Sequence, residues 1–155
     1  MPTDILVRLA RRDERQALEE LQRRASLEWD DHRADLLAHP DAMALAVDQI
    51  EAERVHIAEF RDRIGGFCVV LSRPDGDAEL DGLFVEPHTW RQGIGRRLVD
   101  EAAKVAAAEQ ATWLYVIAGR RALPFYAECG FELLGETSTR FGPAFVMRKR
   151  ARPGV

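Results

Sequence analysis

A junction near the middle of the chain carries the residues whose types and spacing best suit chemistry. An apolar run that ends at Val85 is followed, after a short loop, by Trp90-Arg91-Gln92-Gly93-Ile94-Gly95-Arg96-Arg97. The main-chain N–H groups at a helix start lack partners within the helix, and the helix dipole adds positive potential there. Glycines at such a start remove the Cβ atoms that would keep an anion from the main chain. This junction (residues 90–97) therefore predicts a site for a diphosphate.

Arginines at the junction support the same prediction. A first helical turn normally favours Asp or Glu, whereas Arg96 and Arg97 lie in this one and Arg91 comes just before it. The dinucleotide-binding fingerprint has a third glycine where this chain has Leu98, and the Gly-Lys-Ser/Thr of the P-loop is absent, so neither nucleotide-binding motif matches. The residues alone thus leave the phosphate ligand open, and a chance pattern at a helix start is the alternative.

Apolar periodicity indicates the elements that must position this junction. Strands are expected at residues 5–9, 55–60, 64–71, 78–85, 112–117, 131–134 and 144–150, and helices within residues 11–25, 30–50, 93–109 and 122–129. Antiparallel hairpins therefore precede a strand-helix-strand crossover. We expect an α/β (α+β) fold, with a mixed, mostly antiparallel central sheet of about seven strands flanked by about four helices. Residues 1–155 fit a single domain of this kind.

Composition narrows the classes of function. The formal net charge of −4 argues against a nucleic-acid-binding protein, because such domains usually carry a basic excess over one face. Cys68 and Cys129 are far apart in sequence, and the four histidines are not spaced as a ligand set, so we expect no metal site. Neither a leader nor an apolar stretch of membrane-spanning length is apparent, so a cytoplasmic protein without a membrane partner is expected.

A second segment, Gly119-Arg120-Arg121-Ala122-Leu123-Pro124-Phe125-Tyr126-Ala127-Glu128-Cys129-Gly130-Phe131, follows the next predicted strand. With the junction, it resembles the GNAT superfamily of acetyl-CoA-dependent N-acetyltransferases. The junction is similar to that family's pyrophosphate motif R/Q-x-x-G-x-G/A, and the second segment to its N-x-x-A-x-x-F-Y-x-x-x-G-F signature. The resemblance extends from about Ile5 to Lys149. Two positions depart from it, since Trp90 stands for the Arg or Gln and Gly119 for the frequent Asn.

The resemblance implies an enzyme that moves an acetyl group from acetyl-CoA to a primary amine by direct attack in a ternary complex. A small-molecule amine is favoured over a protein. The main chain of the strand end would pair with the pantetheine arm, and the junction would hold the pyrophosphate. The implied cofactor-binding residues are Leu83, Phe84, Val85, Arg91, Gln92, Gly93, Ile94, Gly95, Arg96 and Tyr126. Tyr126 would also give its proton to the departing thiolate, as a phenol with a pKa of about 10 can do.

Transfer to an amine also requires a group that takes up a proton, because most amines are protonated at neutral pH. Glu79 and Asp81 lie on one face of the predicted strand over residues 78–85, by its period of two. Either can be a solvent-facing charge instead. We rank Asp81 first, because it is nearer in sequence to the pantetheine segment, and keep His88 as a third candidate.

Two classes of function stay open at this point. The first is the N-acetyltransferase, and the second is a non-catalytic acyl-CoA-binding sensor or assembly module. The strip Glu28-Trp29-Asp30-Asp31-His32, with Asp35, is a candidate acidic lip for a cationic amine, or else a solvated helix start. A homodimer is a further expectation that the sequence does not test.

Overall fold

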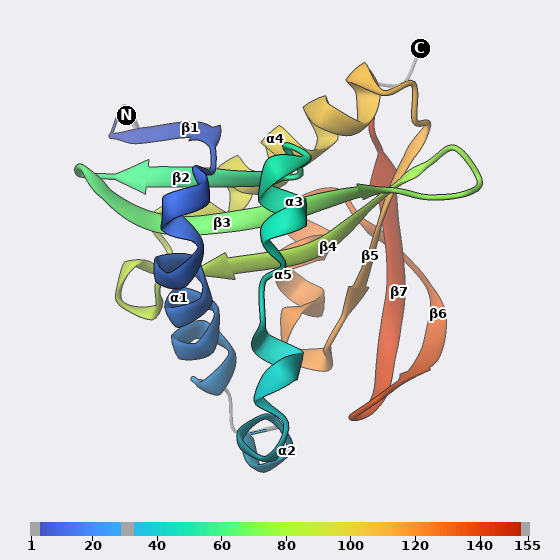
Figure 1. Cartoon of the computed structure of the whole chain (residues 1–155). Coiled ribbons are helices and arrows are strands. Elements are labelled where there is room, and N and C mark those ends of the chain that lie inside the picture. Colours follow the sequence, from blue (N-terminus) through green and yellow to red (C-terminus); the bar gives the residue numbers. More distant parts are fainter. Residues whose placement is uncertain (1–3, 29–32, 153–155) are drawn as a thin grey trace. The chain divides into compact units, whose positions relative to one another are not determined.

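The computed structural model describes residues 4–28 and 33–152 (Figure 1). The strands within them are β1 (Ile5–Leu9), β2 (Val55–Phe60), β3 (Arg63–Ser72), β4 (Ala78–Val85), β5 (Trp113–Ala118), β6 (Glu132–Thr139) and β7 (Gly142–Arg150). The α-helices are α1 (Arg15–Leu27), α2 (Arg33–Ala38), α3 (Val47–Glu51), α4 (Ile94–Ala108) and α5 (Leu123–Glu128). Short 3-10 helices are η1 (Arg12–Glu14), η2 (Pro40–Met43), η3 (Pro87–Thr89) and η4 (Arg120–Ala122).

The strands form a seven-stranded sheet in the order β1-β2-β3-β4-β5-β7-β6. Strand β4 pairs in parallel with β5, through Ala78 to Leu80, whereas β1–β2, β2–β3, β5–β7 and β6–β7 are antiparallel. The predicted mixed, mostly antiparallel sheet is confirmed. The described residues hold one α-helix more than the four expected, because the stretch around Pro40 contains two short helices separated by η2.

The chain's contacts group it into two compact units. Unit 1 comprises residues 1–69 and 82–98, and unit 2 comprises residues 70–81 and 99–155. Each unit is therefore built from two segments, and β3, β4 and α4 each supply residues to both. The single domain over residues 1–155 stays a prediction.

Unit 1 has its core between β2, β3 and the helices around them. Val55 to Ala58 are buried in β2, and Leu18, Leu21 and Ala25 form the buried stripe of α1 at helical spacing. Figure 1 shows α1 and α3 over β2 and β3. The first turn of α4 buries Ile94 and Leu98 almost completely. The apolar periodicity that predicted these elements therefore also fixes which faces pack.

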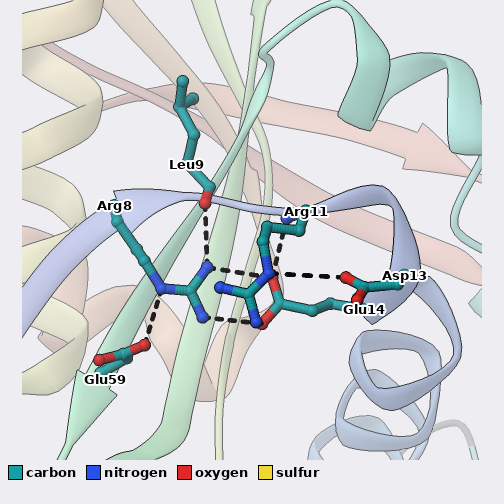
Figure 2. Close-up of polar contacts among 6 residues, drawn as sticks. All are labelled: Arg8, Leu9, Arg11, Asp13, Glu14 and Glu59. Atoms are coloured by element: carbon teal, nitrogen blue, oxygen red, sulfur yellow. Dashed lines mark hydrogen bonds and ion pairs between the residues drawn. The ribbon is translucent and has the colours of Figure 1, made fainter.

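An ion cluster fastens the N-terminal part of unit 1 (Figure 2). The Arg8 guanidinium on β1 donates to both carboxylate oxygens of Glu14 at 3.0 and 2.7 Å, and to Glu59 on β2 at 2.7 Å. Arg8 hydrogen bonds hold the pKa of Glu14 below its ordinary value. Glu14 also accepts from the main-chain N–H of Arg11 at 2.8 Å. The cluster joins β1, η1 and β2, so its role is structural.

In unit 2, side-chain burial alternates strictly along β5. Leu114, Val116 and Ala118 are buried, whereas Ile117 on the opposite face is 50% exposed. The sequence predicted a strand over residues 131–134, and the structure extends this strand. Strand β6 runs to Thr139 and pairs with β7 at the edge of the sheet. The residues after Leu134 are mostly polar and exposed, as is common in an edge strand, so the sequence shows no apolar alternation there. Among the described helices, none is long and apolar enough to cross a membrane.

Candidate functional site

The segment that leads into the junction is held by several hydrogen bonds. The Glu86 N–H donates to the Gly65 carbonyl on β3 at 2.8 Å. The Glu86 carbonyl accepts from the Thr89 N–H at 2.9 Å and from the Thr89 hydroxyl at 2.8 Å. The indole N–H of Trp90 donates to the Val85 carbonyl at 2.9 Å. The anchor segment (residues 85–90) therefore has a fixed shape.

The junction itself has an unusual backbone. Arg91 adopts a φ of 69° and Gly93 a φ of 86°, both in the left-handed region that favours glycine. Arg91, Gln92 and Gly93 are exposed, and so are Arg96 and Arg97 in the first turn of α4. A Cβ atom added at Gly93 would meet no atom within 4 Å, so space is open beside this main chain.

Helix α4 then presents its first turn beside that space. Its first intrahelical bond joins the Arg97 N–H to the Gly93 carbonyl at 3.1 Å. The main-chain N–H groups of Ile94 and Gly95 precede that bond, so they have no acceptor within the helix. No acidic residue lies in this first turn. The exposed glycine, the amides and the cations are groups that can bind a diphosphate, and a diphosphate site at this junction stays a prediction.

Two glycines on β3 set the position of this helix start. A Cβ atom at Gly66 would lie 2.8 Å from the Phe84 carbonyl and 3.1 Å from Ile94 Cγ2. A Cβ atom at Gly65 would lie 2.9 Å from Ile94 Cδ1. The absence of side chains here lets the first turn of α4 pack on the strand, so the buried Ile94 side chain fixes the helix start and only its main chain is available to a ligand. The Gly65-Gly66 pair was visible in the sequence, but its role was not inferred.

The remaining predicted cofactor-binding residues of unit 1 lie at the end of β4. Leu83, Phe84 and Val85 are half-buried. The Phe84 ring packs against the Phe67 ring with centroids 5.3 Å apart. Phe84 therefore belongs to the core of unit 1 by its side chain, and only main-chain groups of this segment suit a ligand.

Unit 2 holds the two candidate carboxylates, and these differ in their surroundings. Glu79 lies 3.6 Å from Arg73 Nη1 in an ion pair, and the same guanidinium stacks on the Tyr115 ring at 4.0 Å. Asp81 is exposed as a residue, yet the protein atoms around its carboxyl group desolvate it and raise its pKa above the ordinary value. A carboxylate with a raised pKa accepts a proton more readily, which suits Asp81 for base catalysis.

Tyr126 also lies in unit 2, on α5. The residue is 8% exposed, and its ring makes edge-to-face contacts with Phe125 at 5.1 Å and Phe131 at 5.3 Å between centroids. The Tyr126 carbonyl accepts from the Phe131 N–H at 3.0 Å. Aromatic packing therefore fixes the orientation of the ring. Gly119, where the resemblance predicts Asn, has open space at its Cβ position.

The other candidates lie around a cavity in unit 1. Glu28, Arg33 and His88 line this cavity of about 520 Å³ together with Arg24 and Glu86. His88 is exposed in η3, three residues before Arg91. The acidic strip is represented only by its ends, Glu28 and Asp35, since residues 29–32 lie outside the described residues.

The chain is similar to known proteins in both sequence and fold. A family model described as the acetyltransferase (GNAT) family matches residues 15–131. No curated protein sequence matches the chain. The fold is similar to the PaiA N-acetyltransferase of Thermoplasma acidophilum in complex with coenzyme A, at 18% identity over 94% of this chain and 98% of that one, with a TM-score of 0.77. It is also similar to Ard1 from Thermoplasma volcanium, at 15% identity over 97% and 100% of the two chains and a TM-score of 0.75. For an aminoglycoside 6'-N-acetyltransferase complexed with coenzyme A, the identity is 18% over 97% and 99%, with a TM-score of 0.71.

Proposed function

Because the chain belongs to the acetyltransferase (GNAT) family, we propose that it transfers the acetyl group of acetyl-CoA to a primary amine in a ternary complex. The observation that carries the proposal is the exposed, glycine-bearing start of α4, where amides and arginines face open space. A small-molecule amine is favoured over a protein. The likeness in fold to an aminoglycoside acetyltransferase supports that preference.

The junction and the strand before it bind the cofactor in this proposal. Main-chain N–H groups from Gly93 to Gly95 hold the diphosphate, with Arg91, Gln92 and Arg96 around it. The main chain of residues 83–85 pairs with the pantetheine arm. Bound acetyl-CoA supplies the thioester carbonyl that the amine attacks.

Residues of unit 2 move the protons. The amine nitrogen forms a bond to the acetyl carbon, the carbon–sulfur bond breaks, and the amine proton passes to Asp81. Tyr126 gives its hydroxyl proton to the departing thiolate. We place Asp81 ahead of Glu79, because Arg73 engages the Glu79 carboxylate in an ion pair, whereas desolvation raises the pKa of Asp81.

A binding experiment tests the proposed cofactor. Gly95→Asp adds a carboxylate beside the amides of the first turn of α4, where it would repel a diphosphate. Isothermal calorimetry should show acetyl-CoA binding to the unaltered protein and at least about tenfold weaker binding to the variant. Unchanged affinity in a folded Gly95→Asp protein would remove the junction as the binding site.

A second assay separates the enzyme from the non-catalytic module. Release of free thiol from acetyl-CoA is measured against a panel of amines. The enzyme requires thiol release that depends on an amine. Tight acetyl-CoA binding without such release across the whole panel would support the sensor or assembly module.

A further inference from the structure

We propose that the ion pair between Arg24 and Glu86 is a positioning device that holds the anchor segment, and through it the junction, in the shape that binds a diphosphate. This assignment rests on the proposed function. Arg24 Nε and Nη2 donate to the two carboxylate oxygens of Glu86 at 2.9 and 2.6 Å. Such a two-pronged pair fixes direction as well as distance.

Glu86 is the most constrained residue of the anchor segment. It is 9% exposed, although it carries a charge. Its side chain binds Arg24 on α1, its N–H binds β3 through Gly65, and its carbonyl binds Thr89. A single residue thus joins α1, β3 and η3, all within unit 1. A charged residue is rarely so buried unless it is paired, so the position of Glu86 depends on Arg24.

The anchor segment needs this restraint, because a strained backbone follows it. Arg91 has a left-handed φ of 69°, a conformation that a residue with a Cβ atom adopts only when its surroundings impose it. Five hydrogen bonds of the anchor segment and the Arg24–Glu86 pair precede it directly. Without the pair, we expect Arg91 to relax and the amides of the first turn of α4 to lose their common direction toward the ligand.

A loss of stability alone would not reveal the positioning role. The Arg24 side chain is 52% exposed but that of Glu86 is only 12% exposed, so removing Arg24 leaves a buried carboxylate without this partner and also destabilises the fold. Arg23, its neighbour on α1, is exposed as well and provides a matched control on the same helix. The role of Arg24 is therefore seen best in ligand affinity.

The experiment compares two ligands on Arg24→Met, Glu86→Gln, the double variant and Arg23→Met. Acetyl-CoA carries the diphosphate and S-acetylpantetheine lacks it. We expect Arg24→Met and Glu86→Gln each to weaken acetyl-CoA binding about tenfold, with S-acetylpantetheine affinity and kcat within about twofold of the unaltered protein. The double variant should lose no more than the worse single variant, and Arg24→Lys should recover part of the affinity. Arg23→Met should bind both ligands normally.

The alternative outcomes are distinct. Equal weakening for both ligands, or unchanged acetyl-CoA affinity in folded Arg24→Met and Glu86→Gln proteins, would overturn the positioning role while leaving the proposed function intact. Absence of acetyl-CoA binding by the unaltered protein would overturn the proposed function itself, and this inference with it.

Discussion

Apart from Tyr126, which has both roles, the residues assigned to cofactor binding lie in unit 1, and the proposed proton-transfer residues Asp81 and Tyr126 lie in unit 2. The first group acts mainly through main-chain atoms and the second through side chains. In unit 1, the junction offers main-chain amides on a backbone held by Glu86, Thr89 and Trp90. In unit 2, Asp81 and Tyr126 offer side chains whose surroundings set their proton affinity and orientation. Ligand binding by main-chain amides can survive replacement of a side chain, whereas proton transfer by a side chain is lost when that side chain is replaced. Variants in unit 1 should therefore change affinity, and variants in unit 2 should change turnover.

The largest expected effect tests the chemical half of this comparison. Asp81→Asn removes the proposed proton acceptor at nearly constant volume, and we expect kcat to fall about 100-fold, with acetyl-CoA affinity unchanged. Steady-state kinetics and calorimetry measure the two quantities. In the unaltered protein, the acid limb of kcat/KM should report the raised pKa of Asp81, with activity increasing as the pH rises through it. A weaker affinity with normal kcat would contradict the division between units.

Glu79→Gln is the matched control, since it removes the same charge two residues away on β4. Its kcat should stay within about threefold, because Arg73 engages Glu79 in the structure.

Stability provides an independent check on Asp81. The folded state raises the pKa of Asp81, so its stabilising contribution is present below the unfolded pKa and is lost as the pH rises through the folded pKa. Asp81→Asn should thus be more stable, relative to the unaltered protein, at neutral pH than at pH of about 3.

The same contrast explains which features the sequence predicted. Glycine spacing and apolar periodicity are local signals, so the junction, β4 and the buried face of α4 were predicted from short stretches of chain. Likewise, the place of Tyr126 on a short helix before Gly130 followed from one segment. The candidate carboxylates were also named, but their ranking by environment required the Arg73 partner and the desolvation of Asp81.

Features that depend on distant residues were not predicted. Arg24 and Glu86 are 62 residues apart, and neither local sequence predicts that they form an ion pair. The hydrogen bond from the Trp90 indole N–H to the Val85 carbonyl was not predicted either, because it depends on the turn formed by η3. That hydrogen bond gives the departure from the family's Arg or Gln a structural role, since Trp90 fixes the anchor segment. The shape of this site therefore depends on the long-range Arg24–Glu86 pair as well as on local hydrogen bonds such as that of Trp90.

A smaller effect probes the binding half of the comparison. Arg91→Gly relieves a left-handed φ, and we expect the free energy of unfolding to rise by about 0.5 to 1 kcal/mol after the greater chain entropy of glycine is subtracted. Acetyl-CoA affinity should fall about fivefold, because one cation is lost, while kcat stays unchanged. Glu53→Gly, at a φ of 62°, is the control that should gain stability without losing affinity. A turnover defect in Arg91→Gly would break the separation of roles.

The smallest expected effect asks whether unit 2 also contributes to binding. Gly119 has a φ of −74° and a ψ of 163°, and a Cβ atom there meets no atom within 4 Å, so Asn fits without strain. Because the GNAT resemblance implies a cofactor contact from Asn at this position, Gly119→Asn should bind acetyl-CoA about two- to threefold more tightly. Gly119→Ala controls for the loss of backbone freedom and should bind as the unaltered protein does. If the Asn variant gains affinity and the Ala variant does not, cofactor binding extends into unit 2 through side chains; if neither changes, binding rests on the main chain of unit 1.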